Sequence, residues 1–199
     1  MWWAELLNSI VSVLDSGGAG GGGAAFESIA TVSGTGSSAT ITFSSIPSTY
    51  TSLQFRILDK YSYTSVANAM DVKIYFNGVN SGTGYAYHQL KGDGSTVTAA
   101  GSASQSEIGI DSPTPSSNAS YANIMGVGII DIQDYASTTK NKTLRAMTGY
   151  DANGAGQIIL SSGLRASTDA ITSVSFLLGN AGYSWTTSTV ISLYGIKGA

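Results

Sequence analysis

Apolar side chains change their spacing along the chain at residue 26. Before this point they recur every three to four residues, which is typical of one face of a helix. After it they recur in about ten short runs of period two, separated by turn residues, which is typical of stacked antiparallel strands. We therefore expect an all-β fold, an antiparallel β-sandwich or jelly roll, preceded by a short α-helix.

The first 16 residues have the pattern of an amphipathic anchor helix, without the basic start of a signal peptide or the length of a membrane span. Residues 17–25 form a Gly-rich linker, so we assign 26–199 to one sandwich domain. A helix this short is marginal alone, and a second copy, the sandwich or a larger partner must cover its apolar face. The apolar face of this anchor consists of Trp2, Trp3, Leu6, Leu7, Ile10, Val11 and Leu14.

Turn residues separate the predicted strands. Asn77-Gly78, Asp93-Gly94 and Asn153-Gly154 tolerate the positive φ angles of tight hairpins. We expect the longest irregular surface loop at 101–118, which contains two prolines. The predicted strands are 26–32, 39–43, 53–58, 72–76, 85–90, 107–110, 122–132, 143–150, 157–160, 171–178 and 189–196.

Charge and composition exclude several classes of protein. Only 11% of the 199 residues are charged, the net charge is −3, and the basic residues are scattered singly. Nucleic-acid binding needs a basic patch, so we expect no nucleic-acid partner. The absence of cysteine excludes disulfides and thiolate chemistry. A weakly charged surface also does little to prevent self-association, which favours a symmetric oligomer.

No motif indicates catalysis, and we expect a protein that is not an enzyme, with no cofactor and no metal site. His88 is the single histidine, and its neighbours Ala86 and Leu90 suggest that it lies on the core side of its strand. The acidic residues form no recognisable acid/base pair. Asp151-Ala152-Asn153-Gly154 lacks the other ligands of a calcium loop, so we interpret it as a hairpin turn.

Tyrosine is the remaining candidate for a binding function. Exposed tyrosine rings can stack on sugars or form protein interfaces. The candidate surface or glycan contacts are Tyr61, Tyr63, Tyr85, Tyr87 and Tyr121.

Several motifs between residue 26 and the C-terminus resemble small structural proteins of tailed bacteriophages, of the tail fibre, minor tail or head decoration type. The motifs are Phe43–Tyr50, Phe76–Gly78, Tyr85–Leu90 with Gly92–Gly94, Ile130–Tyr135, Gly149–Asp151 and Ile191–Ala199. The resemblance implies a non-enzymatic virion protein, assembled in the host cytoplasm.

The resemblance leaves the role within the particle open. A tail fibre or baseplate appendage that binds the host surface is the first interpretation, because many weak contacts add up in a multivalent display. A capsid decoration (cement) protein is the alternative, and a carbohydrate-binding lectin module is a further one. In each case we expect the N-terminal anchor to bind other phage structural proteins, and we expect a homotrimer or another symmetric oligomer.

Overall fold

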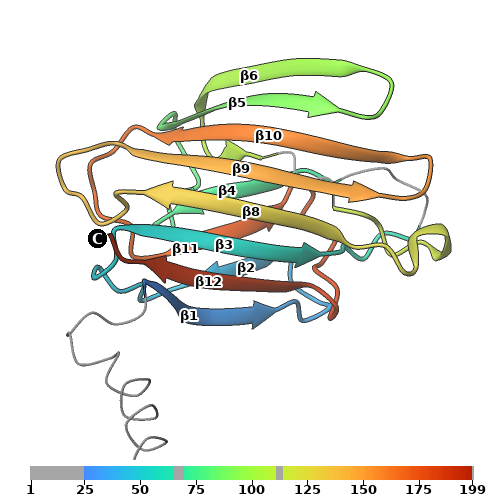
Figure 1. Ribbon diagram of the computed structural model, residues 1–199, viewed down its shortest axis with the longest axis horizontal. Helices are drawn as coiled ribbons and strands as arrows, with labels where there is room; N and C mark the ends of the chain where they lie inside the picture. The colour runs from blue at the N-terminus through green and yellow to red at the C-terminus, as the bar shows by residue number, and fades with distance from the viewer. Residues whose placement is uncertain (1–24, 65–69, 111–113, 199) are drawn as a thin grey trace, which may run out of the picture.

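A computed structural model describes residues 25–64, 70–110 and 114–198. It contains two antiparallel sheets and no α-helix in these ranges, so the predicted β-sandwich is confirmed (Figure 1). The anchor and most of the linker, residues 1–24, lie outside the described residues, and the first strand begins at Phe26.

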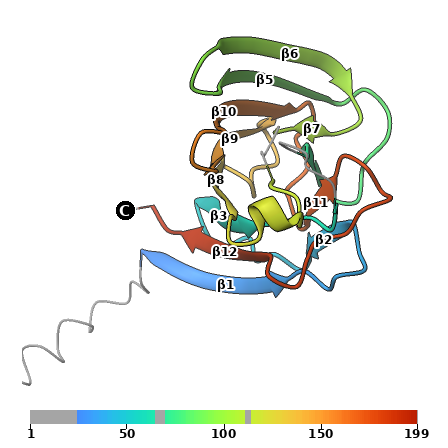
Figure 2. The same ribbon diagram turned by 90° about the vertical axis from the view of Figure 1, so that its right-hand side faces the viewer.

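The larger sheet has eight strands in the order β1-β12-β3-β8-β9-β10-β5-β6. The smaller sheet has four, in the order β2-β11-β4-β7, and covers one face of the larger (Figure 2). The strands of the larger sheet are β1 (Phe26–Ser33), β3 (Ser52–Asp59), β5 (Tyr85–Gly92), β6 (Val97–Gln105), β8 (Gly126–Gln133), β9 (Lys142–Asp151), β10 (Gly156–Arg165) and β12 (Val190–Ile196). Those of the smaller sheet are β2 (Thr40–Phe43), β4 (Val72–Phe76), β7 (Ile108–Gly109) and β11 (Val174–Leu178), and a short 3-10 turn, η2 (Ala119–Tyr121), precedes β8.

The core lies between the two sheets. Alternate residues of each central strand point inward, as in β3, where Phe55 and Ile57 are buried while Arg56 is exposed. Phe55 of the larger sheet meets Phe43 and Phe176 of the smaller sheet edge-to-face, with ring centroids 5.3 and 5.1 Å away. This geometry suits aromatic rings and stabilises the contact between the layers.

The predicted turns adopt positive φ where the sequence indicated it. Asn153 and Gly154 have φ of 53° and 111° and connect β9 to β10 as a tight hairpin, and Gly94 has φ of 90° between β5 and β6. Asn77 and Gly78 also have positive φ, but the hairpin prediction is wrong there. This turn carries the chain from β4 in the smaller sheet to β5 in the larger, because both edges of β4 already pair with β11 and β7.

The predicted irregular loop 101–118 is wrong in its first part. Residues 97–105 form β6, which pairs with β5 at one end of the larger sheet. Nearly all β6 side chains are exposed on both faces, so burial imposes no apolar alternation on its sequence.

Candidate functional site

The outer face of the larger sheet, turned away from the smaller one, carries the most unusual surface of the described structure. Eight aliphatic side chains on six strands are between 39% and 73% exposed there. Contiguous exposed apolar surface of this kind usually marks an interaction site. We call this set the apolar band: Leu58, Leu90, Val97, Val127, Ile129, Met147, Ile158 and Leu160.

Strand register arranges the apolar band in two adjacent rows that cross the strands. In the first row, Ile129 lies opposite Met147, Met147 opposite Leu160, and Leu160 opposite Leu90. Directly opposed side chains are close enough to pack, so this row is a continuous aliphatic ridge over β8, β9, β10 and β5.

In the second row, aliphatic side chains alternate with glycines. Val127 lies opposite Gly149, Gly149 opposite Ile158, Ile158 opposite Gly92, and Gly92 opposite Val97. A side chain on Gly149 would place its Cβ 2.8 Å from the carbonyl oxygen of Gln157, so a larger residue would require the backbone of β10 to shift. The missing side chains open a depression between aliphatic walls.

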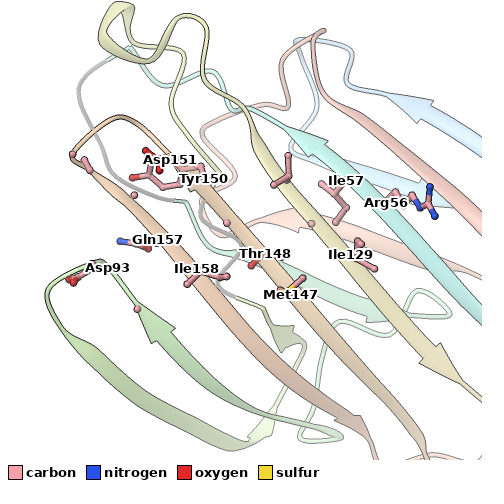
Figure 3. A pocket seen from close by; sticks show the side chains of 18 residues that line it. Arg56, Ile57, Asp93, Ile129, Met147, Thr148, Tyr150, Asp151, Gln157 and Ile158 are labelled. Atoms are coloured by element: carbon pink, nitrogen blue, oxygen red, sulfur yellow. The ribbon is translucent and has the colours of Figure 1, made fainter.

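This depression is a groove of about 750 Å³ on the outer face, ending at the hairpin turns after β5 and β9 (Figure 3). Ile129, Met147 and Ile158 line it from three neighbouring strands. Asp93 is one of the few charged groups on its rim. Hydrogen bonds from the backbone N–H groups of Ser95 and Thr96 lower the pKa of the Asp93 carboxyl. This carboxylate therefore stabilises the turn between β5 and β6.

A polar row bounds the apolar band on its other side. Gln54 donates to Asp131 at 2.9 Å, and Arg145 donates to the same carboxylate at 3.1 Å. Arg56, at the end of the aliphatic ridge, stacks on the rings of Phe26 and Tyr194, each centroid 5.1 Å from the guanidinium carbon. These polar groups are already paired within the sheet, so among the described residues the apolar rows are the part of the face left without a partner.

The structure corrects the expectation of surface tyrosines for three of the five candidates. Tyr61, Tyr85 and Tyr121 are core residues with at most 7% of their surface exposed. Tyr63 and Tyr87 are partly buried and pack against the core. Tyr85 shows the reason, since its hydroxyl donates to the Val79 carbonyl and accepts from the Phe76 N–H, both at 2.9 Å, and so joins the two sheets.

The predicted orientation of His88 is also wrong. Tyr85 and Gln89 point into the sandwich, whereas His88 is exposed on the outer face. Gln89 tolerates burial because its amide donates to the Gly109 carbonyl at 3.0 Å. Leu90, whose apolar character suggested the opposite orientation, belongs to the apolar band.

Buried amines give no catalytic site either. Lys60 and Lys142 are at most 5% exposed, and each ammonium donates to three backbone carbonyls. Burial lowers the pKa of both amines, but with all three N–H donors occupied they hold loops together. Within the described ranges no three His, Asp or Glu side chains are placed to bind a metal, and no helix is long and apolar enough to cross a membrane.

The particle-anchoring residues Trp2, Trp3, Leu6, Leu7, Ile10, Val11 and Leu14 lie outside the described residues. No protein family, curated protein or solved structure matches the chain. Function must therefore be inferred from the chemistry of the outer face. A broad aliphatic surface with a glycine-floored groove can bind apolar protein surface.

Proposed function

We propose that this chain is a non-enzymatic structural protein of a bacteriophage particle that functions by contact through the apolar band. The phage assignment is supported by the sequence motifs that resemble tailed-phage structural proteins. The contact function is supported by the two rows of half-exposed aliphatic side chains on the outer face. This band is the observation that carries the proposal.

The apolar band can contribute appreciable binding free energy. Full burial of an aliphatic side chain contributes about 1.5–3 kcal/mol, so the exposed half of each of the eight retains about 1 kcal/mol. Their sum, roughly 8 kcal/mol, is available before the cost of ordering and association. It is sufficient for a specific contact when many copies bind the same particle.

The chemistry of the groove favours a protein segment over a sugar as its occupant. Its walls are aliphatic, and Tyr150, the tyrosine among its lining residues, is only 6% exposed. Sugar sites need exposed aromatic rings and free hydrogen-bonding groups. The burial of Tyr61, Tyr85 and Tyr121 removes most of the residues that motivated a lectin.

Two places in the particle fit this proposal. An appendage of the tail fibre or baseplate type would hold the sandwich by the N-terminal segment and present the outer face to its neighbours. A capsid decoration protein is the second candidate, and the broad extent of the apolar band over six strands favours it. Contact with a shell requires a wide surface of this kind.

The test replaces two opposed side chains of the apolar band in the phage that encodes this chain. In Met147→Glu/Leu160→Glu, about 2 kcal/mol of burial is lost and two carboxylates are desolvated, so incorporation should fall at least tenfold. The matched control, Thr143→Glu/Ser162→Glu, changes the same two strands on the same face, outside the apolar band.

The readout is the amount of the chain in purified particles, measured by quantitative mass spectrometry, with circular dichroism confirming that both variants fold. We expect the wild-type chain and the control in the particles and the band variant largely absent. A wild-type chain that does not copurify with particles would refute the phage assignment. A band variant incorporated as well as the control would refute the contact function.

A further inference from the structure

The free edge of β6 is the second unpartnered feature of the described structure. β6 is the last strand of the eight-stranded sheet and pairs on one side with β5. In the described ranges no strand pairs with its other side. Its nine residues include no charge and no proline, and its middle is made of small side chains, Thr98 to Ala103.

The surroundings of β6 make this edge unusual. β7 of the smaller sheet packs against β5, whereas β6 lies beyond it and has both faces uncovered (Figures 1 and 2). Long edge strands are normally protected by charges, prolines or bulges, because their free N–H and C=O groups can pair with another chain.

The opposite edge of the same sheet has such protection. β1 contains a bulge between Ser28 and Ala30, and Glu27 forms an ion pair with Lys197 at 2.7 Å. β1 also packs against β2 of the smaller sheet. In β6 the register shift lies near Gln105, which leaves 97–102 as a regular, uncharged edge.

We propose that two copies of this chain associate through antiparallel pairing of their β6 strands. A two-fold axis perpendicular to the sheet makes the edges antiparallel and keeps both outer faces on the same side. Outward residues must then oppose outward residues. If the axis passes through Ala99, Ala99 of one copy lies opposite Ala99 of the other. Val97, the bulkiest outward residue of β6, then lies opposite Gly101 of the other copy, the smallest outward residue.

The charges nearest to this edge are compatible with the pairing. Lys91 and Asp93 both lie at the turn end of the β5–β6 hairpin, so the two-fold axis places those of the two copies at opposite ends of the interface. No like charges face each other, which is the usual obstacle to pairing between identical edges.

Pairing would also join the two apolar bands. Leu90 lies opposite Ala99 on the outer face, so the aliphatic ridge of one copy continues through two Ala99 residues into the ridge of the other. The dimer would thus present one outer face of sixteen strands, twice the eight of a single copy. This inference depends on the β6 edge alone and stands or falls separately from the phage assignment.

The first test uses disulfide cross-linking, for which the natural absence of cysteine is an advantage. Ala99→Cys in the full chain should form a covalent dimer under mild oxidation, because the two thiols face each other across the axis. Thr31→Cys, on the exposed outer face of β1, is the matched control. Cross-linking of Ala99→Cys no faster than the control would overturn the proposal. Preferential cross-linking through Ala100→Cys would contradict the stated register.

The second test measures association by sedimentation velocity over a wide micromolar range. We expect the wild-type chain to dimerise, and we expect Ala99→Lys, which places two ammonium groups opposite each other, to be monomeric over the same range. Ser33→Lys on β1 should behave as wild type. A monomeric wild-type chain, or a dimer that survives Ala99→Lys, would refute pairing through β6.

Discussion

Alkaline pH should destabilise the sandwich through its buried tyrosines, and Tyr61 permits the sharpest test. Tyr61 is 1% exposed, and its ring lies 6.0 Å from that of Tyr63 and 5.7 Å from that of Tyr183. Burial, followed by the neighbouring phenols, raises the pKa of Tyr61 from 10.0 to about 12. The folded protein therefore keeps this proton where the unfolded chain releases it.

The sign and size of the effect follow from this difference in pKa. Below pH 10 both states hold the proton, and the contribution of Tyr61 to the free energy of unfolding is fully present. As the pH rises from 10 to 12 the unfolded state ionises first, and stability falls by about 1.4 kcal/mol per pH unit. The loss from Tyr61 alone reaches roughly 2–3 kcal/mol at pH 12.

Other buried groups titrate in the same pH range, and some of them lower the free energy of unfolding with rising pH while others raise it. Burial raises the pKa of Tyr85, Tyr135 and Tyr150, which adds to the loss. Burial lowers the pKa of Lys60 and Lys142 below 10.5, so their contribution to stability increases as pH rises. The effect of Tyr61 must therefore be measured as a difference between two proteins.

The assay is urea unfolding at pH 8, 10, 11 and 12 for the wild type, Tyr61→Phe and the control Tyr194→Phe on the outer face. Tyr61→Phe should lose roughly 2–3 kcal/mol less between pH 10 and 12 than the wild type does. Tyr194→Phe should follow the wild type. If the three proteins lose stability in parallel, Tyr61 does not titrate as its burial requires, and the reasoning is refuted.

Two further substitutions test packing and a buried charge by the urea midpoint. Gly195→Ala should destabilise the protein by about 1–3 kcal/mol, because the new Cβ would lie 2.4 Å from the Tyr50 ring. This ring cannot move away freely, since the Tyr50 hydroxyl donates a hydrogen bond to Glu27. An unchanged urea midpoint would contradict the prediction. Lys142→Met should cost roughly 2 kcal/mol because three partly buried backbone carbonyls lose the ammonium donor that they share. Lys140→Met, which removes an exposed ion pair, should cost less than about 1 kcal/mol, and equal effects of the two would refute the role of Lys142.

Period-two alternation predicted the strands whose inner face is buried. β3 and β9 alternate buried and exposed residues along most of their length, and their predicted ranges agree with the structure to within one residue at each end. Turn chemistry was equally informative at Asn153-Gly154, where only a few residue types tolerate positive φ. Both signals are local in sequence. They reflect two requirements of every β-sandwich, namely burial of one face of each central strand and positive φ in tight turns.

The sequence could not predict elements whose residues escape that constraint. β6 is exposed on both faces, so its small polar residues resemble a loop, and its strand character comes only from backbone pairing with β5. The sequence predicts the wrong face for His88 because Leu90, two residues away, is apolar and suggests the core side. That inference fails wherever the outer face of a sheet is itself apolar.

The apolar band has a sequence signal of its own, which alternation obscures. Ile158-Ile159-Leu160 and Ile129-Ile130 are uninterrupted apolar runs, typical of strands covered on both faces. The smaller sheet covers only one face of β8 and β10, and no other element among the described residues covers the second face of these strands. A chain that uses few charges elsewhere and leaves these runs exposed is suited to an assembly in which another surface completes the layer.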